Sequence, residues 1–320
     1  MAHDRIIAMR TALALCLSLA LTASQLTAEE VTLTRPDAVL RGTWSAPDNP
    51  AAAALILPGS GPTDRDGNSA AGLSTDAYRQ LAEALAARGI ATLRADKRGI
   101  GASTGDPNAV TLGLYAQDAG GWIDMARDRT GLPCLWLIGH SEGALVTLKT
   151  AQARDDLCGL VLLAPPGRPV SQILLEQLNG VPALDPHMEA AKRAIVSLIA
   201  GQTVDPASLP TPLQGLFHPA VQPFLMDLFG FDPAEAAAEV TLPVLLIRGS
   251  ADLQIAAVDA ERLSAALPQV EAIALPGITH ALKTAGDDSR DANLATYADP
   301  AIPLAAGLAE AVARFLLAPR

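Results

Sequence analysis

The sequence predicts an α/β fold, in which a mostly parallel central sheet is flanked by helices and carries a helical cap insertion. Two observations predict the layered part. Short apolar runs alternate with amphipathic stretches of helical length, and half of the 320 residues are hydrophobic. A third observation predicts the cap, because residues 165–239 break the alternation with prolines and short amphipathic stretches over a length that is uncommon for a plain loop.

The elements follow in order along the chain. An antiparallel pair is expected to open the sheet, and the later strands are expected to be parallel because helices separate them. We expect strands at 31–33, 39–45, 53–57, 90–94, 134–138, 160–164, 244–248 and 271–275. We expect helices at 77–87, 112–127, 144–151, 258–267 and 304–317, and cap helices at 170–178, 188–199 and 223–228. The core is therefore assigned to residues 29–164 and 240–320, and the cap to residues 165–239, where a long irregular loop is the alternative.

The first 28 residues have the pattern of a signal peptide. Arg5 and Arg10 form a basic start, and residues 11–23 form an apolar centre that is short for a membrane span. Cleavage is expected after Ala28, with an earlier site or an uncleaved anchor as alternatives. The mature chain would carry 21 basic and 33 acidic residues, which argues against nucleic acid or an anionic membrane as its partner. We therefore expect a periplasmic or secreted bacterial protein with no stable membrane association, and the sequence leaves its oligomeric state open.

Two cysteines, Cys134 and Cys158, follow the predicted leader. Each stands just before one of two successive apolar strands. If these strands are parallel neighbours, both cysteines lie at the same end of the sheet, where an oxidising compartment would join them. A disulfide and a pair of buried thiols are both open, because the required Cα–Cα reach of under about 7 Å cannot be read from a sequence.

A nucleophile motif stands at residues 139–143, Gly-His-Ser-Glu-Gly, directly after the apolar run 135–138. It matches G-x-S-x-G in the strand, turn and helix context that this motif requires. Such a turn exposes the hydroxyl of Ser141 in a strained conformation at a helix N-terminus. Because the pattern alone is common by chance, the partners of Ser141 decide whether it is interpreted as a catalytic nucleophile.

The partners of a nucleophilic serine are a base and an acid that orients the base. His280 lies between the last predicted strand and the final helix, whereas the other histidines lie in the leader, beside the serine or in the cap. Asp252 follows the predicted strand 244–248. The chain order Ser141, Asp252, His280 is that of α/β hydrolases. We therefore predict these three residues as a catalytic triad.

Acyl transfer also needs two hydrogen-bond donors for a developing oxyanion. The backbone N–H of Glu142 is the first, because it follows the nucleophile. The second is expected from the glycine-rich loop 59–61, with the N–H of Ser60 as first choice and that of Gly61 as second. The side chain of Glu142 is expected mainly to favour the helix N-terminus.

Several segments resemble those of a known family. They read Gly-Ser-Gly-Pro-Thr-Asp-Arg-Asp-Gly-Asn at 59–68, Arg-Ala-Asp-Lys-Arg-Gly-Ile-Gly at 94–101, the motif at 139–143, Thr-His-Ala-Leu-Lys at 279–283 and the tail 293–300. From about Val39 onward the chain is similar to bacterial serine esterases of the α/β-hydrolase superfamily with a GSGPxDRDG-type loop, grouped with serine aminopeptidase-like hydrolases. The resemblance implies the α/β-hydrolase fold and hydrolysis of carboxylic esters, often with short acyl chains, without a metal or organic cofactor. Many relatives carry His where this chain has Pro58, and substrate preference does not transfer because the cap is the least similar part.

Other side chains carry weaker expectations. The charged residues at 64–66 and 97–98 are expected to brace the oxyanion loop, and Arg168 is expected to face the pocket from the cap entrance. Five apolar cap residues are expected to line the pocket or, as is more common for such stripes, to form the core of the cap. They are Ile173, Leu174, Leu216, Phe217 and Phe224.

Taken together, the residues predict a secreted serine carboxylesterase that acts on a small-molecule ester with a short- to medium-chain acyl group. A peptidase or amidase with the same triad is the alternative, because the leaving group is chosen by pocket geometry. A non-catalytic binding protein on a hydrolase scaffold is a third hypothesis, which the complete triad disfavours.

Overall fold

The computed structural model describes residues 27–319. Most of the predicted leader therefore lies outside the described residues. Its last two positions, Thr27 and Ala28, open strand β1 (Thr27–Thr34), where they pair with Ala46 and Ser45. Cleavage after Ala28 would remove the first two residues of this strand.

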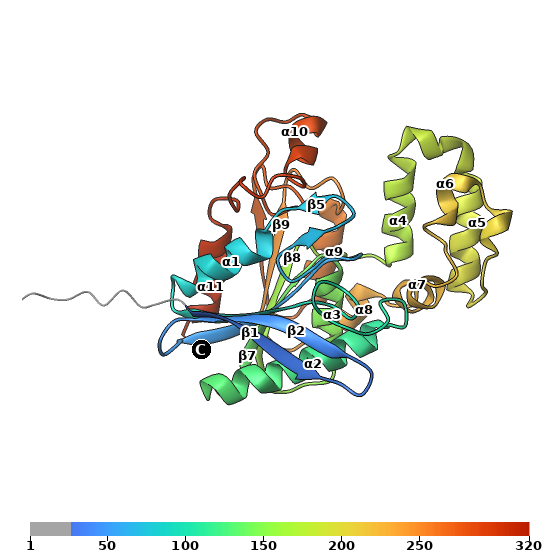
Figure 1. The fold of residues 1–320 in the computed structure, drawn as a ribbon. Helices are drawn as coiled ribbons and strands as arrows, with labels where there is room; N and C mark the ends of the chain where they lie inside the picture. Colours follow the sequence, from blue (N-terminus) through green and yellow to red (C-terminus); the bar gives the residue numbers. More distant parts are fainter. Residues whose placement is uncertain (1–26, 320) are drawn as a thin grey trace, which may run out of the picture.

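An eight-stranded sheet forms the centre of the molecule, with strand order β1-β2-β6-β3-β7-β8-β9-β10 (Figure 1). The other strands are β2 (Val39–Ala46), β3 (Ala52–Leu57), β6 (Ile90–Ala95), β7 (Leu135–His140), β8 (Leu157–Leu163), β9 (Val244–Gly249) and β10 (Val270–Leu275). Strand β2 is antiparallel to both of its neighbours, and all other pairs are parallel. This arrangement confirms the predicted fold class.

Helices cover both faces of the sheet because alternate residues of the central strands point to opposite sides. Leu55 and Leu137 join one buried cluster, whereas their neighbours Ile56 and Ile138 join the other. Helices α2 (Leu112–Thr130), α3 (Glu142–Ala151) and α9 (Ala257–Ala266) pack into the first cluster, and α1 (Ala77–Ala86) and α11 (Leu308–Leu317) pack into the second. The strands are therefore buried on both sides, which explains their continuous apolar runs.

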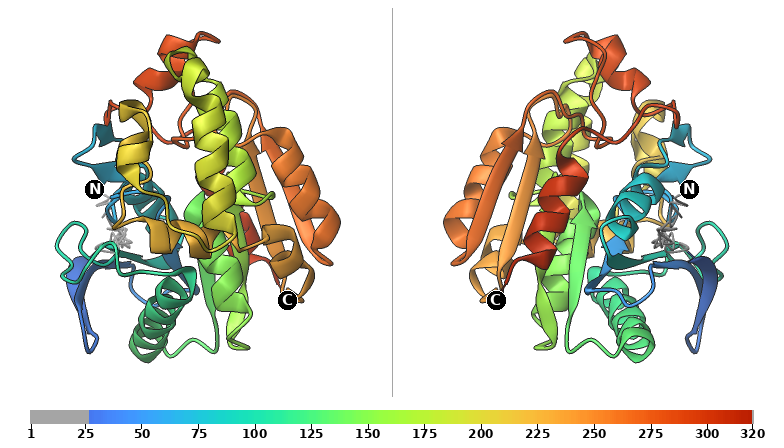
Figure 2. Two further views of the ribbon diagram at one scale, coloured as in Figure 1. Left: turned by 90° about the vertical axis from the view of Figure 1, so that its right-hand side faces the viewer. Right: turned by 90° about the vertical axis from the view of Figure 1, so that its left-hand side faces the viewer.

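The cap lies between β8 and β9. It contains α4 (Val170–Asn179), α5 (Met188–Ile199), α6 (Thr211–Gln214), α7 (Gln222–Phe229), α8 (Pro233–Ala238) and the 3₁₀ turns Pro182–His187 and Pro206–Ser208. Figure 1 shows α4, α5 and α6 to one side of the sheet, and the left view of Figure 2 looks onto them. These helices have an apolar cluster of their own, in which Phe217 is fully buried and against which Leu174 and Leu216 pack. These three side chains therefore form the core of the cap.

Both ends of the cap are attached to α9. The Arg168 guanidinium binds the fully buried Asp259 at 2.8 Å, and the N–H groups of Gly167 and Arg168 donate to the same carboxylate. At the other end, Arg262 binds Asp232 at 2.6 Å. The expectation that Arg168 faces the pocket is wrong, because a buried carboxylate on the core binds its side chain.

Local backbone constraints explain where the elements differ from the prediction. Helix α11 begins at Leu308 rather than 304, because Gly307 has φ 82° and residue 304 instead forms a β-bridge with Lys283. The short hairpin β4 (Asn68–Ser69) and β5 (Leu73–Ser74) and helix α10 (Arg290–Ala295) were not predicted, because each is too short to show a periodic pattern.

Cys134 and Cys158 are joined by a disulfide in the structure, with their Cα atoms 5.1 Å apart. Strands β7 and β8 are parallel neighbours, so the two cysteines meet at the end of the sheet where both strands begin. Cys158 is the second residue of β8 and does not precede it. Over residues 27–319, none of the helices has the length and apolar character needed to cross a membrane.

Candidate active site

Ser141 occupies the turn between β7 and α3, where its backbone has φ 54° and ψ −121°. A residue with a side chain rarely adopts a positive φ, so the surrounding structure must enforce it. The two glycines of the motif permit this geometry. A Cβ atom on Gly143 would collide with the carbonyl oxygen of Leu57, and one on Gly139 would collide with the carbonyl oxygen of Gly143. The motif therefore lets α3 start directly against β3 with Ser141 at the tip of the turn.

His280 and Asp252 form a hydrogen-bonded pair. The imidazole Nδ1 lies 2.8 Å from Asp252 Oδ2, and the N–H groups of Gln254 and Ile255 donate to Oδ1 at 2.8 and 3.0 Å. Burial alone would raise the pKa of Asp252, but the charge of His280 and these hydrogen bonds outweigh burial and hold the pKa below its ordinary 3.8. A carboxylate that stays ionised fixes the Nδ1–H tautomer of the histidine and leaves Nε2 as the base.

One cavity brings the predicted site residues together. Ser60, Ser141 and His280 all line it. Within the described chain the Ser141 hydroxyl is not hydrogen-bonded to His280, and such contacts often tighten only when substrate binds. The structure therefore places the predicted nucleophile, the predicted base and one predicted oxyanion donor around a single space, with Asp252 behind His280, whereas Glu142 lines a separate groove.

The loop 59–61, predicted to hold the oxyanion, is held at each peptide around Ser60. The N–H of Gly59 donates to the Tyr78 hydroxyl at 3.0 Å, and its carbonyl oxygen accepts from Lys97 Nζ at 2.7 Å. The carbonyl oxygen of Ser60 accepts from Thr63 Oγ1 at 2.8 Å. No acceptor among the described residues binds the N–H of Ser60, which leaves that donor for a ligand.

His140, the residue before Ser141, links this loop to the base. Its Nε2 donates to the carbonyl oxygen of His280 at 2.9 Å, and its Nδ1 accepts from the Tyr78 hydroxyl at 2.7 Å. A carbonyl oxygen only accepts, so these partners fix the tautomer. Burial and the nearby charge of His280 lower the pKa of His140 to about 3, so this imidazole is neutral at ordinary pH.

Sequence reasoning did not find the roles of His140 and Tyr78. Tyr78 stands near the start of a predicted helix, 62 residues before its partner, and a single aromatic residue there carries no signal. The ion pair between Lys97 and Glu142, at 3.4 Å, was also missed, because it depends on how two separate loops meet.

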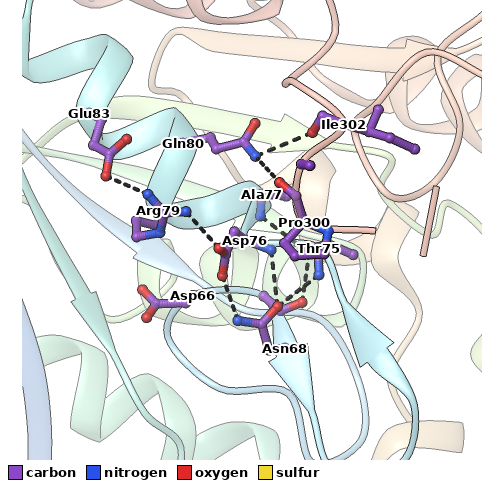
Figure 3. Close-up of polar contacts among 12 residues, drawn as sticks. Asp66, Asn68, Thr75, Asp76, Ala77, Arg79, Gln80, Glu83, Pro300 and Ile302 are labelled. Carbon is purple, nitrogen blue, oxygen red and sulfur yellow. Dashed lines mark hydrogen bonds and ion pairs between the residues drawn. The ribbon is translucent and has the colours of Figure 1, made fainter. Parts of the chain in front are cut away.

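The segment after the oxyanion loop is braced by the polar network in Figure 3. The amide of Asn68 donates to Asp76 at 2.7 Å and accepts the N–H groups of Thr75 and Asp76 at 2.7 and 3.0 Å. On α1, Arg79 bridges Asp76 and Glu83. The network thus attaches the hairpin β4–β5, which walls the cavity, to the start of α1.

Of the charged segments 64–66 and 97–98, Lys97 confirms the expectation of a brace, because its ammonium group binds the carbonyl oxygen of Gly59 in the loop 59–61. Asp66 binds Arg94, and the N–H of Arg65 donates to Asp96 at 2.8 Å. These contacts attach the segment after the loop 59–61 to β6 and to the residue that follows it. Arg98 departs from the expectation, because it binds Asp118 on α2 and Asp37 in the β1–β2 turn.

The tail near residue 295 braces the loops that carry Asp252 and His280, the predicted acid and base. Asn293 Nδ2 donates to the carbonyl oxygen of Ala251 at 2.6 Å, next to Asp252. The hydroxyls of Thr296 and Thr279 share a hydrogen bond at 2.9 Å, next to His280. Across the described part of the chain, no group of three or more His, Cys, Asp or Glu side chains is placed to hold a metal ion.

The chain is similar to known hydrolases. The family described as serine aminopeptidase, S33, matches residues 71–211. Esterase EstD of Thermotoga maritima is 29% identical over 213 residues, which is 66% of this chain and 49% of EstD, so the chain spans about half the length of this relative.

Solved structures show the same architecture. Est1E from Butyrivibrio proteoclasticus with ferulic acid bound has a TM-score of 0.58 at 20% identity, covering 90% of this chain and 98% of Est1E. Proline iminopeptidase of Mycobacterium smegmatis has a TM-score of 0.57 at 19% identity, covering 90% of this chain and 97% of that protein. With the sheet order and the turn at Ser141, these likenesses show that the chain has the α/β-hydrolase fold.

Proposed function

We propose that this protein is a serine carboxylesterase that hydrolyses short- to medium-chain acyl esters through an acyl-enzyme intermediate. The observation that carries the proposal is the placement of Ser141, on a strained turn, in the same cavity as a His280 that is paired with Asp252. The likeness to EstD, a protein named as an esterase, supports the same reaction class.

The proposed mechanism uses each of these groups once per half-reaction. His280 Nε2 takes the proton of Ser141 as the hydroxyl attacks the ester carbonyl, and the oxyanion is bound by the N–H groups of Ser60 and Glu142. Protonated His280 then gives the proton to the leaving alcohol as the tetrahedral intermediate collapses. Water, deprotonated by the same imidazole, attacks the acyl-enzyme, and protonated His280 returns the proton to the oxygen of Ser141 as the acid is released. Asp252 stabilises the imidazolium throughout.

The lining of the cavity favours an ester over the N-terminus of a peptide. An aminopeptidase must bind the substrate ammonium group, for which a carboxylate is the usual partner. Among the described residues that line the cavity beside Ser141, none is Asp or Glu, and the one described carboxylate in the groove assigned below to the acyl chain, Glu142, is already paired with Lys97. A peptidase with the same triad is the second candidate, and the family match and the iminopeptidase neighbour are the reasons to test it.

We assign the acyl chain to a groove beyond the oxyanion loop. This groove is lined by Gly61 and Pro62 on the loop, by Tyr115 on α2 and by Phe224 on the cap. The rings of Tyr115 and Phe224 meet edge to face, with centroids 5.9 Å apart. Of the five apolar cap residues singled out from the sequence, Phe224 is the one that lines this groove.

Export to an oxidising compartment is also part of the proposal. It is supported by the signal-like pattern of the first 28 residues and by the disulfide between Cys134 and Cys158. N-terminal sequencing of the protein from a periplasmic fraction tests it, and a start near residue 29 is the expected result.

The experiment that tests the function compares the mature protein with its Ser141→Ala variant. Both are assayed on p-nitrophenyl esters of about two to twelve carbons and on an aminoacyl-p-nitroanilide. We expect ester turnover that falls by about 10⁴- to 10⁶-fold in the variant, because triad members act as a unit. Equal circular dichroism and melting temperatures would show that the variant is folded. Turnover of the anilide alone would establish a peptidase, and ester turnover that survives in Ser141→Ala would refute the assignment of the nucleophile.

A further inference from the structure

The carbonyl oxygen of Gly59 is bound by a lysine from another loop. Lys97 Nζ donates to it at 2.7 Å, and the Lys97 side chain is only 9% exposed. Burying an ammonium group away from water costs free energy, so the partners of a buried ammonium group indicate its role. This partner is the carbonyl of the peptide whose N–H belongs to Ser60, the proposed oxyanion donor.

Because of the geometry of a peptide unit, this contact also fixes the direction of the N–H bond of Ser60. A trans peptide is planar, and its C=O and N–H bonds point in opposite directions. The Gly59–Ser60 peptide is trans. Fixing the Gly59 carbonyl toward Lys97 therefore fixes the N–H of Ser60 away from Lys97. Ser60 lines the cavity that holds Ser141, whereas Lys97 lines the groove on the other side of the loop.

The same ammonium group reaches the residue that carries the second donor. Lys97 Nζ lies 3.4 Å from Glu142 Oε1, and the Glu142 side chain is 6% exposed. Glu142 is the first residue of α3, so its N–H is one of the helix donors without an intrahelical acceptor. One buried cation thus contacts the peptide that carries one assigned donor, through the carbonyl of Gly59, and the side chain of Glu142, the residue that carries the other.

We propose that Lys97 is a positioning residue for the oxyanion hole, which holds the Gly59–Ser60 peptide with the N–H of Ser60 aimed at the oxyanion. This proposal rests on the serine esterase function proposed above. Lys97 also polarises the peptide, because a cation on the carbonyl makes the N–H of the same unit a stronger donor. It acts through the peptide and does not touch the substrate carbonyl.

The rival explanation is that Lys97 only neutralises the buried carboxylate of Glu142. Two variants separate the explanations. Lys97→Met removes the hydrogen bond to Gly59 and leaves Glu142 unpaired, and the double variant Lys97→Met/Glu142→Gln removes the unpaired charge as well. If Lys97 positions Ser60, the double variant stays as slow as Lys97→Met. If Lys97 only neutralises charge, the double variant returns to the wild-type rate, which would overturn the proposal.

The measurement is steady-state ester hydrolysis together with binding of an aryl trifluoromethyl ketone, whose adduct with Ser141 carries an oxyanion. We expect kcat to fall about 10- to 100-fold in Lys97→Met, less than for complete loss of a donor, with KM within about threefold of wild type. Affinity for the ketone should fall by the same factor as kcat/KM. Lys97→Arg, which keeps a charged donor, should recover part of the loss. A merely structural role would not produce this split between kcat and KM.

Two controls keep the outcomes distinct. Lys192→Met, on the exposed face of the cap, removes a lysine whose partner is the surface Glu189 and should leave kcat and KM unchanged. Ser141→Ala is assayed alongside. Turnover that depends on Ser141 but keeps the wild-type kcat in folded Lys97→Met would refute the role of Lys97 alone, whereas turnover independent of Ser141 would refute the function on which it rests. If Lys97→Met does not fold, the double variant, which has no unpaired carboxylate, takes its place with the same expected loss.

Discussion

The core and the cap of this protein are held together by different kinds of contact. In the core, the loops that carry Ser141 and His280 are bound to each other by buried hydrogen bonds, such as that from His140 to the His280 carbonyl. The cap has an apolar cluster of its own, charged contacts attach its two ends to α9, and Leu228 on α7 and Ala237 on α8 pack into the core cluster. The groups proposed for chemistry therefore cannot shift independently, whereas the cap can change its lining without disturbing them. We infer that the core sets the reaction and the cap sets the preference among substrates.

The largest expected effects lie in the core. Asp252→Asn should lower kcat by about 10⁴-fold on every ester tested, because the imidazole loses the partner that fixes its tautomer. His280→Ala should lower it at least as far. The measurement is kcat on esters of short and long acyl chains, and the same fractional loss on each would support the division between core and cap. An Asp252→Asn variant with nearly wild-type turnover would mean that another carboxylate is the acid.

The disulfide gives the second effect, on stability rather than rate. Cys134 and Cys158 are 24 residues apart in sequence, so replacing both with Ser should lower the free energy of unfolding by about 3 kcal/mol. Because Cys134 precedes the start of β7 and Ser141 follows its end, kcat of the folded variant should be unchanged. Urea unfolding and ester assays measure the two quantities. A large fall in kcat with unchanged stability would contradict the expectation.

A third prediction concerns pH. The unfolded chain protonates His140 near its ordinary pKa of 6.5, whereas the folded chain does so only near 3, so the stabilisation is complete above pH 6.5 and is lost as the pH falls. Between pH 6.5 and about 5, wild type should lose about 2 kcal/mol more of its unfolding free energy than His140→Gln. Glutamine keeps a donor for the His280 carbonyl and an acceptor for Tyr78. Parallel pH profiles of the two proteins in urea would show that His140 titrates normally.

The smallest effect is expected at the cap. Phe224→Ala should change kcat/KM by a few fold and shift the preferred acyl length, since it widens the groove between α7 and Tyr115. Val196→Ala, at a position 64% exposed on α5, is the matched control and should leave the chain-length profile alone. If Phe224→Ala instead lowered turnover of all esters equally, the groove would not be the acyl site.

The sequence predicted the sheet and the three triad candidates because both rest on local patterns. Buried parallel strands are continuous apolar runs, and Ser141, Asp252 and His280 each follow a recognisable strand or loop in a fixed chain order. Contacts between loops lack such a pattern. The sequence led us to expect that residues 97–98 brace the oxyanion loop, but it does not indicate that the ammonium group of Lys97 meets the carbonyl of Gly59, and nothing near Arg168 indicates a buried partner on α9. These contacts depend on how separate loops fold over the strand ends, which periodicity does not encode.

The attachment of the cap has a consequence for how this scaffold can vary. The chain leaves the core at Arg168 and returns at Asp232, and the two core residues that receive these ends, Asp259 and Arg262, are one helical turn apart on α9. Both ends of the cap are therefore attached to a single helix, α9. A segment of different length or lining that kept these two ion pairs and the packing of α7 against the core would leave the strand order, the strained turn and the loops around Ser141 untouched. Recombination or design can then replace the cap as one segment, which changes the substrate range and retains the reaction.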